Sequence, residues 1–111
     1  MIRALALTLG VAAVPSGAAA HQLVVFASVD CEVVTVEAKF SNGSVARQGD
    51  VRVLDGDNTL LATLALGEDG IATVPLASVD HSGGLVIEVD TGSHDNYWIL
   101  TPDDIARNCR S

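Results

Sequence analysis

Two histidines, His21 and His94, are the residues of this chain best suited to chemistry, and together they predict a small metal site. His21 follows Ala18-Ala19-Ala20, a run of small residues of the kind that signal peptidase cleaves. Cleavage there would make His21 the first residue of the mature chain, with an α-amino group of pKa about 7.7 to 8.0. A divalent metal can displace a proton from such an amine and bind it together with the imidazole of the same residue.

His94, in the sequence Gly-Ser-His-Asp, is the candidate for a third nitrogen ligand. Three nitrogens favour Cu(II) and Ni(II) over oxygen-seeking ions. We expect a carboxylate to hold a ring nitrogen or to add an oxygen ligand, and the candidates are Asp50, Glu68, Asp69 and Asp95. The alternative is that His21 follows the cleavage site by coincidence and that His94 only caps a turn. His81 is predicted to be a hydrogen-bonded turn residue and not a ligand.

No catalytic constellation accompanies the histidines. The sequence has no Gly-x-Ser-x-Gly nucleophile elbow, no phosphate-binding loop and no His-Glu-x-x-His run. We therefore expect a binding protein and not an enzyme. With 14 acidic residues against 6 basic ones and a formal net charge of −8, the chain also lacks the basic footprint that nucleic-acid binding requires.

Cys31 and Cys109 are the only cysteines, and we expect them to form a disulfide after export to an oxidising compartment. A bridge that closes so long a loop would supply a large share of the stability of a small domain. The alternative is two free thiols. A metal site on these thiolates is not expected, because two cysteines alone supply too few ligands.

Residues 1–20 are predicted to be a cleaved signal peptide, which leaves residues 21–111 as a single domain. Arg3 precedes an apolar run over residues 4–14, and Pro15, Ser16 and Gly17 interrupt it before the cleavage site. The run is too short to span a bilayer, and no other apolar stretch of transmembrane length follows. We therefore expect a periplasmic or secreted protein without a membrane anchor of its own.

The elements that position these residues are predicted to be strands. After residue 20, short β-branched runs alternate with turn residues, which is typical of an all-β domain. Strands are expected at residues 22–28, 32–40, 50–54, 59–66, 71–75, 85–90 and 96–100, with one helical turn at 102–107. Seven strands at this spacing predict an immunoglobulin-like or transthyretin-like β-sandwich. A five- or six-stranded barrel is the alternative.

Strands that run alternately up and down would gather the candidate residues at two ends of such a sandwich. One end would hold His21 and His94, and the other end would hold Cys31, Cys109 and His81. If the first strand also pairs in parallel with the last, the two histidines meet at one end and the two cysteines at the other. One assumption about topology thus accounts for both pairs.

Four segments of the chain resemble the small extracytoplasmic accessory subunits of nickel and cobalt uptake transporters of the energy-coupling-factor type. They are residues 21–27, 36–43, 67–72 and 89–94, the last leading into Trp98. The first and last are the most informative, because they combine a histidine at the mature N-terminus with a Gly-x-His loop.

The resemblance implies an immunoglobulin-like or carboxypeptidase-regulatory-like module that binds Ni(II) or Co(II) for a membrane permease. Since the sequence predicts no anchor, the chain would associate with that permease through its surface. The choice of nickel or cobalt rests on the resemblance alone. A periplasmic copper-binding protein of similar shape is one alternative, and a structural or interaction sandwich without metal is the other.

Overall fold

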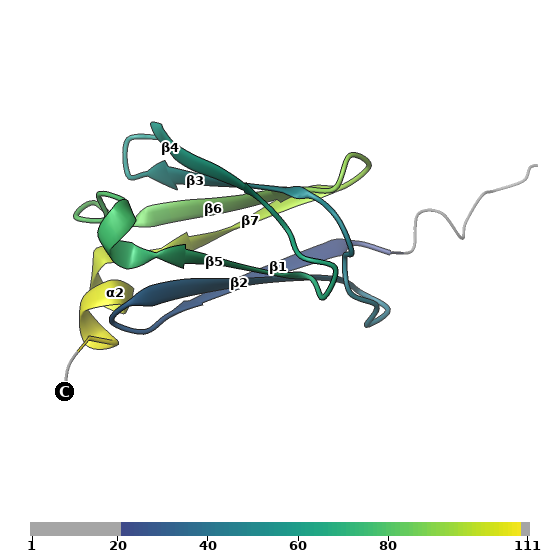
Figure 1. The fold of residues 1–111 in the computed structure, drawn as a ribbon, viewed down its shortest axis with the longest axis horizontal. Helices are drawn as coiled ribbons and strands as arrows, with labels where there is room; N and C mark the ends of the chain where they lie inside the picture. Colours follow the sequence, from purple (N-terminus) through teal and green to yellow (C-terminus); the bar gives the residue numbers. More distant parts are fainter. Residues whose placement is uncertain (1–20, 110–111) are drawn as a thin grey trace, which may run out of the picture.

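The computed structural model describes residues 21–109; the predicted signal peptide lies outside the described residues, as do residues 110–111. Over the described range the chain forms two layers of antiparallel strands (Figure 1). The strands are β1 (Leu23–Val29), β2 (Val33–Phe40), β3 (Asp50–Asp55), β4 (Leu60–Ala65), β5 (Ile71–Pro75), β6 (Leu85–Asp90) and β7 (Asp95–Leu100). A 3₁₀ turn, η1 (Leu76–Ser78), follows β5, and a short helix, α2 (Pro102–Arg107), follows β7.

The strand order confirms the predicted all-β sandwich. One sheet has the order β1-β2-β5 and the other has the order β4-β3-β6-β7. The alternative of a barrel is wrong, because no strand ladder in residues 21–109 joins the two sheets. The arrangement is that of an immunoglobulin-like Greek key in which the fourth strand lies in the sheet of the third, sixth and seventh. Each strand boundary lies within one residue of its predicted position.

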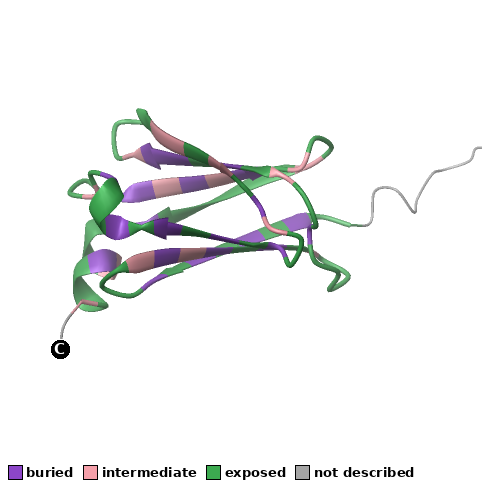
Figure 2. Cartoon of the chain, in the orientation of Figure 1, coloured by how far each residue is buried: buried purple, intermediate pink, exposed green. Residues whose placement is uncertain are grey.

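Alternation of apolar and polar residues builds the core between the two sheets. Along β2, Val34, Val36 and Ala38 are buried, whereas the residues between them face outward. The opposite sheet supplies side chains with no solvent exposure at Val51, Val53, Ile87 and Val89. Figure 2 shows these buried positions along the strands of both layers, with exposed loops at both ends. Burial of such a side chain contributes about 1.5 to 3 kcal/mol, so the core is the main source of stability.

Three loops and the start of β1 lie together at one end, which we call the N-terminal end (residues 21–22, 41–49, 67–70 and 91–94; Figure 1). The backbone N–H of Ser41 donates to the Gln22 carbonyl (2.8 Å), and that of Ala38 donates to the Gly70 carbonyl (2.9 Å). Gly49 lies close to the backbone of Asp90, since a Cβ on Gly49 would be 3.0 Å from the Asp90 carbonyl. Asp90 directly precedes the 91–94 loop, so this loop lies at the same end. These loops therefore gather at the end where the sequence predicts His21 and His94.

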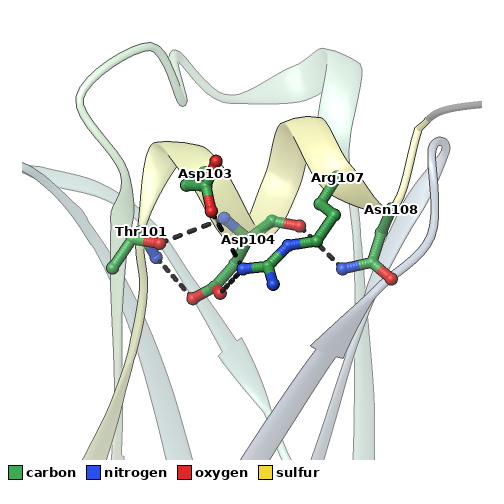
Figure 3. Close-up of polar contacts among 5 residues, drawn as sticks. All are labelled: Thr101, Asp103, Asp104, Arg107 and Asn108. Atoms are coloured by element: carbon green, nitrogen blue, oxygen red, sulfur yellow. Dashed lines mark hydrogen bonds and ion pairs between the residues drawn. The ribbon is translucent and has the colours of Figure 1, made fainter.

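The opposite end is closed by the predicted disulfide between Cys31 and Cys109 and by α2. Thr101 caps this helix: its hydroxyl accepts from the Asp104 backbone N–H (3.0 Å), and its own N–H donates to Oδ2 of Asp104 (3.0 Å; Figure 3). This reciprocal capping box satisfies two backbone donors that a helix start otherwise leaves unpaired. Ile105 anchors the helix in the core, so the end of the described chain is held against the sandwich.

Candidate functional site

Strands β1 and β7 lie side by side and run in the same direction. Near their starts, the side-chain amide of Asn96 donates a hydrogen bond to the Leu23 carbonyl (2.9 Å). Further along both strands, the rings of Phe26 and Trp98 pack edge to face with centroids 5.0 Å apart. Since the two contacts advance together along both strands, the strands are parallel neighbours.

The expected pairing of these two strands in one sheet is wrong. Each is an edge strand of its own sheet, and no backbone ladder connects them within residues 21–109. The order of the elements sets the direction of a strand, whereas ladder pairing depends on which sheet edges meet; the contacts that the structure gives between β1 and β7 are made by side chains, such as the amide of Asn96. The parallel direction that the prediction required is nevertheless present.

An open hollow of about 470 Å³ lies where these strands begin. Its lining includes Gln22 from the start of the described chain and His94 from the β6–β7 loop, together with Leu23, Ser93, Asp95 and Asn96. His21 is exposed and directly precedes Gln22. The structure therefore brings Gln22, the residue next to His21, and His94 to one hollow of the surface.

The backbone of Gln22 is held on both sides by Ser41. Its N–H donates to the Ser41 hydroxyl (3.0 Å), and its carbonyl accepts from the Ser41 N–H (2.8 Å). The chain is therefore fixed up to residue 22, which restricts where His21 can reach.

The backbone of His94 is fixed by a tight turn between β6 and β7. The His94 carbonyl accepts from the Thr91 N–H (2.9 Å), and the His94 N–H donates to the Thr91 hydroxyl (3.3 Å). Gly92 has φ +98°, a left-handed conformation that glycine adopts without a steric penalty, and its N–H donates to Oδ1 of Asp90 (2.7 Å). The loop therefore presents His94 from a defined backbone position.

Two neighbours hold the half-buried imidazole of His94. The Ser93 hydroxyl lies 3.0 Å from Nδ1, and the ring of Phe40 packs against the imidazole at 5.6 Å with an interplanar angle of 72°. A hydroxyl, and not one of the expected carboxylates, thus lies at this nitrogen. Neither neighbour of the imidazole was predicted from the sequence. The position of Ser93 beside His94 was an available signal, whereas nothing local in the sequence links Phe40 to the loop.

Of the other predicted residues, Asp95 lines the hollow with His94, whereas His81 and Asp69 lie elsewhere or bond to the backbone. His81 is at the opposite end, where its carbonyl accepts from the Gly84 N–H (3.0 Å), and Oδ1 of Asp69 accepts from the Ile71 N–H (3.1 Å). In residues 21–109, no group of three or more His, Cys, Asp or Glu side chains is placed to hold a metal ion. The predicted site contains only two of these side chains, His21 and His94, because its third ligand is an α-amino group.

Two features bear on where the protein works. The Cys31–Cys109 disulfide is typical of an oxidising, extracytoplasmic compartment. None of the helices in the described part of the chain is long and apolar enough to cross a membrane. Comparisons with protein-family models, curated proteins and solved structures find no match to this chain.

Proposed function

We propose that this protein captures Ni(II) or Co(II) outside the cytoplasm, through His21 and His94, for a membrane permease of the energy-coupling-factor type. The hydrogen bond between Asn96 and the Leu23 carbonyl is the observation that carries the proposal. His21 and His94 each precede this contact by two residues, and Gln22 and His94 line the same hollow, so we expect the side chains of His21 and His94 to come within reach of one metal ion. The choice of nickel or cobalt rests on the sequence resemblance.

The ligands proposed are the α-amino group and imidazole of a chain that begins at His21, with the imidazole of His94 as the third nitrogen. Nitrogen ligands suit borderline metals such as Ni(II), Co(II) and Cu(II) better than they suit Mg²⁺ or Ca²⁺. Cu(II) is expected to bind most tightly in vitro whichever metal the protein carries in the cell, since affinity follows the Irving–Williams order.

The openness of the site suits transfer better than storage. The hollow lies at the N-terminal end, and His21 is exposed, so a metal held there would remain accessible to a partner. Three protein ligands also leave coordination positions free for an incoming donor group of the permease. We therefore propose capture and delivery as the role.

Calorimetric titration of protein that begins at His21 with Ni(II), Co(II) and Cu(II) tests this proposal. An added glycine before His21 separates the α-amino group from the imidazole of His21, and His94→Ala removes the third nitrogen. Loss of a residue that only hydrogen-bonds to a ligand already lowers metal affinity about tenfold or more, so each of these changes is expected to lower it at least about tenfold. His81→Ala is the matched control, because this histidine lies at the opposite end.

The alternatives predict different results. Equal binding by all variants would place the metal elsewhere, and no binding by any of them would favour a structural or interaction module. Retention of Cu(II) alone under competition from cellular ligands would favour a copper protein. Mass spectrometry of the exported protein adds an independent requirement, because a mature chain that begins at another residue contradicts the proposal.

A further inference from the structure

We infer that Ser93 and Phe40 are positioning residues that reserve Nε2 of His94 for the metal, with Nδ1 held by the Ser93 hydroxyl. This inference rests on the proposed function and assigns the geometry of the same site. It concerns residues that take no metal themselves but fix which nitrogen of the ring is available.

The Ser93 hydroxyl can either accept from Nδ1–H or donate to Nδ1, and the inferred arrangement is the first. The separation of 3.0 Å between Ser93 Oγ and Nδ1 is a normal hydrogen-bond distance. A neutral imidazole has one nitrogen that donates and one that accepts. When Nδ1–H donates to the hydroxyl, the lone pair lies on Nε2, as in metal sites where a second group fixes the tautomer of a ligating histidine.

Phe40 fixes the plane of the ring. It ends β2, is partly buried and packs against the hydrophobic core, so it forms a firm support. Its edge-to-face contact at 5.6 Å is a favoured arrangement of aromatic rings. The two Thr91 hydrogen bonds fix the His94 backbone, and the contact with Phe40 favours one orientation of the imidazole.

The choice of nitrogen affects how far the ligand reaches. Nε2 is the ring nitrogen farther from the backbone, so it extends further toward a metal held by the neighbouring chain start. A ring fixed in its tautomer and orientation before binding also loses less conformational entropy when the metal arrives. The contacts to Ser93 and Phe40 are therefore expected to raise affinity without supplying a ligand.

The first test needs no metal. Proton–nitrogen correlation NMR of the imidazole rings should show His94 mainly as the Nδ1–H tautomer, with a shift toward Nε2–H in Ser93→Ala. Ser93→Thr keeps the hydroxyl and should retain the original tautomer. Ser44→Ala is the matched control: this serine lies at the same end, but its hydroxyl donates to Oδ1 of Asn42 (2.6 Å). A His94 tautomer that does not respond to Ser93→Ala would overturn the inference.

The second test uses Zn(II), a diamagnetic probe, in the same NMR experiment and in calorimetry. Binding should perturb Nε2 of His94, and Ser93→Ala and Phe40→Leu should each lower the affinity by about tenfold. Ser93→Thr should restore binding. Coordination through Nδ1, or unchanged affinity in both variants, would overturn the inference and leave the proposed function intact. Absence of Zn(II), Ni(II) and Co(II) binding by the unmodified protein would overturn the proposed function and, with it, the role of Ser93.

Discussion

The side-chain amide of Asn96 joins β7 to the carbonyl of Leu23 on β1 at 2.9 Å, although the two strands belong to different sheets. Oδ1 of the same amide accepts from the backbone N–H of Tyr97 at 2.8 Å. Since both polar atoms of the amide are engaged, the side chain is held in a single orientation. The Asn96 amide therefore fixes the start of β1 against the start of β7, next to the candidate ligands His21 and His94.

Asn96→Ala is expected to weaken metal binding without removing a ligand. Loss of the bridge should let the starts of β1 and β7 move apart and should lower the affinity for Ni(II), as measured by calorimetry. The unfolding free energy should fall by about 1 kcal/mol for each hydrogen bond lost, as measured by urea denaturation.

The matched control for this change is Asn108→Ala at the opposite end. The side-chain amide of Asn108 donates to the Asp104 carbonyl at the end of α2 (2.7 Å), so a loss of stability of about 1 kcal/mol is expected. Its effect on metal affinity should be negligible. If both variants bind Ni(II) equally well, the Asn96 bridge does not position the site.

The contact between Phe26 and Trp98 should stabilise the same junction of β1 and β7. Both rings remain partly exposed, at 44% and 38%, so most of their contribution should come from each other and not from the core. A double-mutant cycle with alanine at both positions should give a coupling energy of about 0.5 to 1.5 kcal/mol. A coupling near zero would show that the contact between the two rings does not stabilise this junction.

Trp98 is the only tryptophan of the chain, so its fluorescence reports on this junction directly. Phe26→Ala should move the emission to longer wavelength because the indole becomes more exposed to water. Leu60→Ala is a suitable control, since Leu60 is an exposed apolar residue on β4, at the opposite edge of the sheet that contains β7.

Reduction of the Cys31–Cys109 bridge should lower stability but leave metal binding unchanged. The cysteines are 78 residues apart, and the chain-entropy account gives about 4.5 kcal/mol as an upper value for a loop of this length. The melting temperature should fall by several degrees. Because the bridge lies at the end opposite to His94, an equal Ni(II) affinity of the oxidised and reduced proteins is expected at a temperature where both are folded.

The sequence predicted the fold well because the relevant signals are local. Alternation along β2, with Val34 and Val36 inward and Glu37 outward, identifies a strand and its buried face without knowledge of its partners. Turn residues such as Gly70 and Gly92, both with positive φ, mark where strands end. The capping pair Thr101 and Asp104 also lies within one short stretch, and α2 covers the predicted residues.

The arrangement around the candidate site was less predictable because it depends on contacts between distant segments. No local pattern indicates that the amide of Asn96 bridges to Leu23, or that Phe40 packs on the imidazole of His94. The prediction of a parallel ladder failed for this reason: strand direction follows from the order of elements, whereas sheet membership depends on which edges meet. The carboxylates were likewise expected near the histidines because they lie on neighbouring loops, but the group at Nδ1 of His94 is the Ser93 hydroxyl.

The capping box of α2 gives a final prediction, on acid stability. Hydrogen bonds from the backbone N–H and the side chain of Thr101 lower the pKa of the Asp104 carboxyl below its usual value, and the charge of Arg107 lowers it further. A carboxyl with a lower pKa in the folded state stabilises the protein at pH values above its unfolded pKa of about 3.9. This contribution is lost as the pH falls through the folded pKa.

Asp104→Asn should therefore destabilise the protein at neutral pH, and its difference from the unmodified protein should shrink in acid. Urea denaturation at several pH values, from neutral to below the folded pKa, measures this difference. Asp103→Asn is the control, because Asp103 makes an exposed ion pair with Arg107 (2.9 Å), and such pairs contribute little to stability. A difference that stays constant at every pH would contradict the stabilising role of the ionised Asp104 carboxylate at the start of α2.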